Sequence, residues 1–182
     1  MSKYHPAKMH LKEKTITLPE LLDKDKGDSK FRELLHNIFA FSSKIEAIRG
    51  EFGKIIGLTG IEYTALIATA YMRSIDTVYV NSLADHLHLS GAFITLQTNK
   101  LAKKGYLTKT KDPEDARRVQ LDLTDLGYEA LASLAHSQQK VNDVLFAGID
   151  QEQFKTLVKT FGLLANNGDR AFNMASFLSN DK

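Results

Sequence analysis

Residues 81–105 constrain the fold more than any other part of the sequence. Two short helices are predicted, one over Leu83–His88 and one from Ser90 to Lys104, and the four residues Leu87–Ser90 form the tight connection where they meet. Ser90 is suited to cap the second segment, and Gly105 is suited to end it. Two short helices joined by such a turn are typical of a helix-turn-helix.

The segment that follows has the period of a β-strand. Val119, Leu121 and Leu123 alternate with polar residues, and residues 106–111 can pair with them as a second strand. The charged sequence Asp-Pro-Glu-Asp-Ala at 112–116 then forms the turn. A helix-turn-helix followed at once by a hairpin is a winged helix, so we predict a mainly α-helical fold with a small β-hairpin wing.

Further helices flank this unit. Apolar spacing predicts a helix from Phe31 to Ile48, after which Gly50 and Gly53 interrupt the pattern. The stretch 61–72 is apolar enough to lie at the centre of the core. Thr124 can begin one long helix over 124–147, and Asp150 with Gln153 can cap a last helix. These helices account for the remainder of the chain after residue 30.

Positive charge is concentrated beside the predicted wing. The net charge is only +2, but residues 100–120 contain seven lysines and arginines against three acids, a local charge of +4 that leaves −2 elsewhere. A basic patch on a near-neutral protein is typical of a protein that meets polyanions, although a run of charge is often only a solvated face.

Several classes of function are excluded or disfavoured. The absence of cysteine excludes disulfides, thiolate zinc sites and cysteine nucleophiles, and the histidines show neither metal-ligand spacing nor a catalytic motif. We therefore expect neither an enzyme nor a metal or other cofactor. No apolar run approaches the roughly 18 residues of a membrane span, and residues 1–6 do not resemble a signal peptide. We expect a cytoplasmic protein without a membrane partner.

Several motifs together resemble the MarR family of bacterial transcriptional regulators, over about Phe31 to Phe161. They are Leu83-Ala84-Asp85-His86-Leu87, Leu89-Ser90, Gly105-Tyr106-Leu107, Asp112-Pro113-Glu114-Asp115-Ala116-Arg117-Arg118 and Leu123-Thr124-Asp125-Leu126-Gly127. The resemblance implies a homodimer that binds double-stranded DNA at a pseudo-palindromic operator. It also implies a repressor that a small aromatic or phenolic effector releases. The intrachain alternative to a dimer is a helical bundle.

This resemblance suggests a division of the chain. Residues 1–30 form an N-terminal arm, 31–56 and 148–182 form a helical dimerisation region, 57–127 form the DNA-binding lobe, and the helix 124–147 links lobe and dimer layer.

Candidate DNA contacts fall on the second helix of the helix-turn-helix and on the wing. Helical spacing points Ile94, Thr98 and Leu101 inward. The DNA-facing candidates are Ser90, Gly91, Ala92, Thr95, Gln97, Asn99 and Lys100 on the helix, and Lys109, Lys111, Asp115, Arg117 and Arg118 in the wing. Arg117 is suited to the narrow minor groove, and Asp115 could hold its guanidinium group through a bidentate pair.

The sequence departs from the family pattern at two adjacent positions of the recognition helix. Leu96 stands where the family commonly has arginine, and Gln97 stands where it usually has an apolar core residue. Gln97 either faces DNA, where its amide can read adenine, or is a partly buried polar residue with a local partner.

Aromatic side chains with a cation suit an aromatic carboxylate, so His36, Arg49, Tyr63 and Tyr71 are the candidate effector residues. The alternative function is a ligand-independent winged helix that binds DNA or docks a partner.

Overall fold

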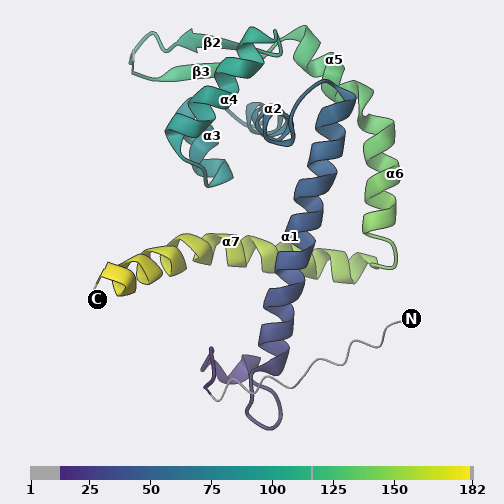
Figure 1. The fold of residues 1–182 in the computed structure, drawn as a ribbon, viewed down its shortest axis with the longest axis vertical. Coiled ribbons are helices and arrows are strands. Elements are labelled where there is room, and N and C mark those ends of the chain that lie inside the picture. The colour runs from purple at the N-terminus through teal and green to yellow at the C-terminus, as the bar shows by residue number, and fades with distance from the viewer. Residues whose placement is uncertain (1–12, 116, 181–182) are drawn as a thin grey trace. The chain divides into compact units, whose positions relative to one another are not determined.

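The computed structural model describes residues 13–115 and 117–180. Residues 1–12 of the predicted arm, Ala116 of the predicted turn and the last two residues lie outside this description. The chain divides into two compact units, residues 1–134 and 135–182 (Figure 1).

The first unit contains most of the secondary structure. Its elements are a short 3-10 helix η1 (Pro19–Leu21), α1 (Ser29–Ile55), α2 (Gly60–Arg73), β1 (Val78–Tyr79), α3 (Val80–Leu87), α4 (Gly91–Lys103), β2 (Leu107–Lys111), β3 (Val119–Leu123) and α5 (Asp125–Ser133). The second unit contains α6 (Ala135–Leu145) and α7 (Gln151–Asn180). The predicted mainly helical fold with a small wing is confirmed.

The wing is the hairpin of β2 and β3, and β1 adds a short edge strand. The strand order is β1-β3-β2, with both pairs antiparallel. Leu107 lies opposite Leu123, and Lys109 lies opposite Leu121. Leu107, Leu121 and Leu123 are all buried, so alternate residues of the hairpin attach it to the lobe, as the period of two predicted.

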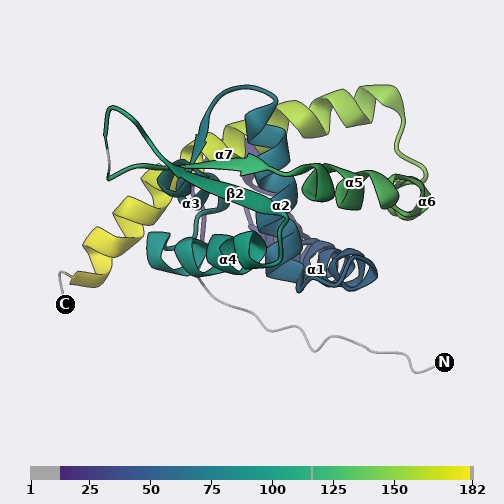
Figure 2. The ribbon, with the colours of Figure 1, turned by 90° about the horizontal axis from the view of Figure 1, so that it is seen from above.

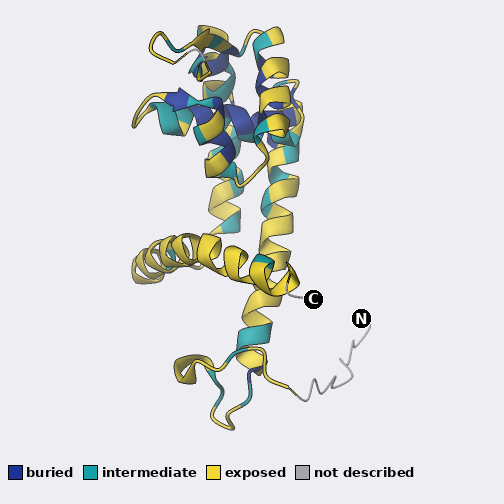
Figure 3. Ribbon diagram, turned by 90° about the vertical axis from the view of Figure 1, so that its left-hand side faces the viewer, coloured by how far each residue is buried: buried dark blue, intermediate teal, exposed yellow. Residues whose placement is uncertain are grey.

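Helix α2 lies at the centre of the lobe. It packs against α1, α3, α4 and β3, and Ala65, Leu66 and Thr69 are fully buried. The Thr69 hydroxyl donates to the carbonyl oxygen of Ala65, so burying this polar group leaves no unpaired donor. The prediction that residues 61–72 form a central core helix is confirmed. Figure 3 shows the buried residues gathered in this lobe, whereas much of α1 is exposed.

Side-chain caps fix where the helices begin. Thr59 and Glu62 form a capping box at α2, because the Thr59 hydroxyl accepts from the Glu62 N–H and the Glu62 carboxylate accepts from the Thr59 N–H. Thr124 caps α5 through the Gly127 N–H, and Asp150 and Gln153 exchange two bonds before α7. The caps at Thr124 and at Asp150 with Gln153 agree with the sequence predictions.

The prediction of a single helix over 124–147 is wrong in one respect. The structure divides it into α5 and α6 at Leu134, a fully buried residue. The Leu134 N–H donates to the carbonyl oxygen of Leu131, three residues back, so the turn tightens there and the α-helical pattern is interrupted.

The junction between β2 and α5 requires glycine. A Cβ added to Gly127 would lie 2.3 Å from the carbonyl oxygen of Tyr106, a backbone atom. The same carbonyl accepts the Thr124 N–H at 3.1 Å, so it is held in place. The close approach of α5 to the start of β2 therefore depends on the absence of a Cβ atom at Gly127.

The described part of the arm is attached to the beginning of α1. Asp28 is buried, and its carboxylate accepts the N–H and hydroxyl of Thr15 at 2.7 and 2.8 Å. It also accepts the Nε–H of Arg32 at 2.9 Å. The Arg32 guanidinium and the two Thr15 donors hold the pKa of Asp28 far below its ordinary value.

The second unit is a pair of helices with little burial of its own. No residue of α6 or α7 is buried among those that the structure describes. Large apolar side chains are exposed along it, among them Phe154, Val158, Phe161, Phe172 and Phe177.

Among the described residues, no single helix is both long and apolar enough to span a membrane. Only α1 and α2 taken together, bent by 89° at their junction, reach that length and composition.

Candidate nucleic-acid interface

Helix α4 is held in the lobe by the three residues that the sequence pointed inward. Ile94, Thr98 and Leu101 are all fully buried, so this prediction is confirmed. The Ser90 hydroxyl accepts the Phe93 N–H and caps the helix, and Gly105 follows its end with φ +81°.

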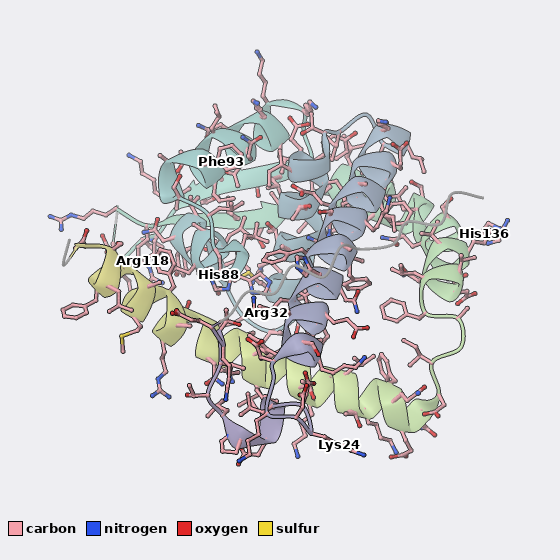
Figure 4. All side chains as sticks on the ribbon, turned by 60° about the horizontal axis from the view of Figure 1, so that its bottom comes forward. Lys24, Arg32, His88, Phe93, Arg118 and His136 are labelled. Carbon is pink, nitrogen blue, oxygen red and sulfur yellow. The ribbon has the colours of Figure 1, made fainter. Side chains whose placement is uncertain are left out.

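The outer face of α4 combines small, polar and apolar side chains. Ala92, Thr95 and Asn99 are exposed, as are Ser90 and Lys100 at its two ends, and Gly91 is half-buried. Leu96 is 51% exposed and Phe93 is 40% exposed. Phe93 is labelled in Figure 4. Apolar side chains therefore share the outer face with hydrogen-bonding groups.

Gln97 does not belong to this exposed face. It is 3% exposed, and its amide oxygen is buried without a hydrogen-bond partner. The assignment of Gln97 as a DNA contact is therefore wrong for this conformation, because Gln97 lies on the same stripe of α4 as Ile94 and Leu101. The predicted local partner of its amide oxygen is also absent among the described residues.

The turn of the wing is organised by Asp112. One carboxylate oxygen accepts the N–H groups of Glu114 and Asp115 at 2.9 and 3.0 Å, and the other accepts the Tyr79 hydroxyl at 2.6 Å. The Tyr79 hydrogen bond and the two N–H groups lower the pKa of Asp112, and the same Tyr79–Asp112 bond together with burial raises the pKa of Tyr79. Asp112 therefore remains an anion that fixes the turn.

Tyr79 is a residue that sequence reasoning missed. The Arg118 guanidinium carbon lies 3.7 Å from the centre of the Tyr79 ring, a cation–π contact. Its position in a short β-strand gave no indication of this role, because Asp112 and Arg118 lie more than 30 residues away along the chain. Tyr79 joins the beginning of the helix-turn-helix to the wing.

The Asp115 carboxylate does not form an ion pair with the Arg117 guanidinium group. Its carboxylate accepts the backbone N–H of Arg117 at 3.0 Å, and its carbonyl oxygen accepts the Arg118 N–H at 2.8 Å. The expected bidentate pair with the Arg117 guanidinium is therefore wrong for this conformation. Asp115 orients the backbone of the turn, and Arg117 is exposed without an ion pair to Asp115.

The two wing lysines differ in their surroundings. The Lys109 ammonium group donates to the Thr98 hydroxyl at 3.1 Å and to the Asn99 amide oxygen at 2.7 Å. Burial lowers the pKa of Lys109 from its ordinary value. Lys111 is exposed and makes no ion pair within the described chain. Lys109 therefore joins the wing to α4, whereas Lys111 is available to solvent.

A hollow of about 220 Å³ lies where α3, α4 and the wing meet. Lys109, Arg117 and Arg118 line it together with Asp85. Thr95 of α4, the first turn of α3, Tyr79 and Val119 complete the lining. Cations from the wing and N–H groups from a helix N-terminus together favour an anion.

The four candidate effector residues do not form one cluster in the chain. Tyr63 is 2% exposed and packs edge-on against Phe52 in the core. Tyr71 is exposed and stacks on His86, and His36 and Arg49 are exposed on α1. The α-helical rise separates positions 36 and 49 by about 20 Å, which is too far for one small aromatic acid.

Comparison with known proteins agrees with this architecture. The sequence model of the MarR family matches residues 73–119, which include the helix-turn-helix and most of the wing. Over these residues the chain matches the MarR family, and its fold is that of a MarR-type winged helix-turn-helix transcriptional regulator. The proteins that it matches are DNA-binding regulators and not enzymes.

Individual relatives are distant in sequence. The chain is 24% identical over 119 residues to the uncharacterized regulator YdgJ of Bacillus subtilis, covering 63% of the chain and 73% of YdgJ. It is 27% identical over 100 residues to the transcriptional regulator SarZ of Staphylococcus epidermidis, covering 55% of the chain and 66% of SarZ.

Solved structures share the fold at lower identity. A MarR protein from Peptoclostridium difficile matches with a TM-score of 0.66 and 20% identity, covering 90% of this chain and 99% of that one. A mutant MarR from E. coli complexed with operator DNA matches with a TM-score of 0.62 and 18% identity, covering 74% of this chain and 95% of that one.

Proposed function

We propose that this MarR-family regulator represses transcription by binding a pseudo-palindromic operator as a homodimer. The observation that carries the proposal is the joint surface of α4 and the wing, where a capped helix with an exposed hydrogen-bonding face adjoins a hollow lined by Lys109, Arg117 and Arg118. The structure of E. coli MarR with operator DNA supports the same use of the fold.

In this proposal the two parts of the surface have different tasks. Ser90, Gly91, Ala92, Thr95, Asn99 and Lys100 present α4 to the major groove, where each base pair has a distinct pattern of donors and acceptors. Lys111 and Arg118 contact phosphates, which position the protein without reading sequence. The free Arg117 side chain reaches the minor groove, where a narrow A·T-rich width concentrates negative potential.

The exposed apolar side chains support dimerisation. They occur on α1, for example Leu34, Phe39 and Phe41, and along α6 and α7. Apolar surface on this scale is unusual for a monomer. We propose that residues 31–56 and 148–182 form the dimer layer, that 57–127 form the DNA-binding lobe and that α5 and α6 connect them. Two-fold symmetry then places the half-sites about one helical turn apart.

We propose an aromatic acid or phenol as the effector that releases DNA. Arg49 and Tyr71 are its accessible candidate ligands, and Tyr63 serves as a core residue. Titration of the protein and of Arg49→Ala with aromatic acids, followed by thermal shift, tests this assignment. A shift that is equal in both proteins removes Arg49 from the site.

A ligand-independent regulator is the second candidate. The burial of Tyr63 and the separation of His36 from Arg49 along α1 favour it, because they leave no single cluster for the effector. In that case no aromatic acid changes the melting temperature or the affinity for DNA.

The decisive experiment is an anisotropy titration on the DNA upstream of the protein's own gene, at physiological salt with excess competitor. We expect binding at least about a thousandfold tighter than to competitor DNA, by a dimer in sedimentation equilibrium. Lys54→Ala, which removes an exposed cation from α1, is the control for the wing variant Arg117→Ala. Equal affinity for specific and competitor DNA would refute the sequence-specific function.

A further inference from the structure

The contact between Lys109 and Asn99 fixes how α4 presents an amide to DNA. Strand β2 runs beside α4 (Figure 2), and the Lys109 ammonium group reaches across to the Asn99 side chain at 2.7 Å. Asn99 is exposed on the outer face of the helix, and one end of its amide faces the wing.

The hydrogen-bonding chemistry of Lys109 determines which end of the Asn99 amide faces the wing. An ammonium group has donors only, so the Asn99 atom that faces Lys109 is the carbonyl oxygen, and the alternative orientation would set two donors against each other. The Asn99 NH₂ group, which carries two donors, is therefore the end left for a ligand.

The position of Lys109 is itself determined by the core. Its second bond is to the hydroxyl of Thr98, which is fully buried and donates in turn to the carbonyl oxygen of Ile94 at 2.9 Å. A side chain held at two points, one of them on a buried residue, has less freedom than a surface lysine. Lys109 is therefore suited to hold the Asn99 amide in one orientation.

We propose that Asn99 is a specificity-determining residue that donates to a keto oxygen, guanine O6 or thymine O4, and that Lys109 is the positioning residue that imposes this choice. The inference rests on the proposed DNA-binding function and deepens it by naming the class of base. An asparagine that reads adenine needs both its carbonyl oxygen and its NH₂ group, because adenine presents a donor beside an acceptor. Lys109 takes one lone pair of the oxygen and holds it toward the wing, so the NH₂ group is the end that meets the base, where the amino groups of adenine and cytosine would face it as donors.

The test begins with selection of binding sites from random DNA by the wild-type protein and by Asn99→Ala. The position whose preference disappears in Asn99→Ala is the position that Asn99 reads, and we expect guanine or thymine there on the contacted strand. Exchange of guanine for adenine, or of thymine for cytosine, replaces the keto acceptor with an amino donor. This exchange should weaken wild-type binding about tenfold or more.

Variants of the two residues separate positioning from simple affinity. Lys109→Met frees the amide to turn over, so the ratio between keto and amino bases should fall below about threefold, and Lys109→Arg, which retains donors, should restore it. Lys111→Met is the matched control, because it removes a lysine from the same strand and should weaken all sites alike. Asn99→Asp keeps an acceptor for Lys109 but has no donor, so it should lose the preference for keto bases.

Two results would overturn the inference while leaving the function intact. One is adenine or cytosine at the position that Asn99 reads, and the other is a keto-to-amino ratio that Lys109→Met leaves unchanged. Asn99→Asp alters only an exposed side chain, so the base preference can be tested even if Lys109→Met does not fold. Failure of the wild-type protein to enrich any sequence would instead refute the sequence-specific function itself.

Discussion

Replacement of Gln97 by leucine should stabilise the protein. The Gln97 amide oxygen is buried without a partner among the described residues, on a stripe of α4 whose other members are Ile94, Thr98 and Leu101. A buried polar group without a hydrogen bond costs about 1–3 kcal/mol, and leucine has a similar size without that group. We therefore expect Gln97→Leu to raise the free energy of unfolding by about 1–3 kcal/mol.

Urea unfolding at a fixed protein concentration measures this change, because dimerisation makes apparent stability depend on concentration. The midpoint should rise with an unchanged m-value, and the melting temperature should rise by ~2–4 °C for each kcal/mol. Gln120→Leu is the control, since the half-buried Gln120 amide donates to Asp122 at 2.9 Å and its loss should bring no gain. A Gln97→Leu protein less stable than the wild type would refute the reasoning, because it would mean that the amide oxygen has a partner such as an ordered water.

Three further predictions concern the wing, the lobe and the arm. Arg117→Ala should weaken operator binding by about 1–3 kcal/mol in anisotropy titrations, and a parallel loss of thermal stability would mean that this exposed arginine is structural. Gly127→Ala should cost about 1–3 kcal/mol or more in urea unfolding, because its Cβ would lie 2.3 Å from the Tyr106 carbonyl oxygen, and a neutral result would contradict that close approach. Asp28→Asn should destabilise the protein near neutral pH. The depressed pKa of Asp28 contributes stability above its unfolded value of 3.8, and this stability disappears as pH falls through the folded pKa. The difference in melting temperature between Asp28→Asn and the wild type should therefore shrink below about pH 4, and a constant difference would exclude the carboxylate as its source.

Tertiary contacts give Lys109 and Lys111 different electrostatic surroundings. By sequence the two residues are equivalent, since they lie two apart on one strand and carry the same charge. In the structure Lys109 is engaged by Thr98 and Asn99, whereas Lys111 is exposed. Only Lys111 is therefore expected to behave as a simple phosphate contact, with a salt slope that falls by about 1 when it is removed.

The elements of this protein could be predicted from the sequence because their signals are local. Ser90, Thr59 and Thr124 each cap a helix through N–H groups within three residues, so spacing along the chain is sufficient. The alternation of Val119, Leu121 and Leu123 likewise predicted a strand with one buried face. The break at Leu134 escaped prediction, because it accompanies complete burial of that side chain in the lobe and has no glycine or proline to mark it.

The sequence by itself therefore determined the helices, the hairpin and the class of DNA-binding fold. Only the tertiary structure decided which side chains of that fold remain available to DNA. It buried Gln97, tied Lys109 to Asn99 and joined Tyr79 to Asp112 across 33 residues of chain. The physical reason is that caps and periodicity depend on neighbours along the chain, whereas the burial and pairing of a polar group depend on elements that meet only when the chain has folded.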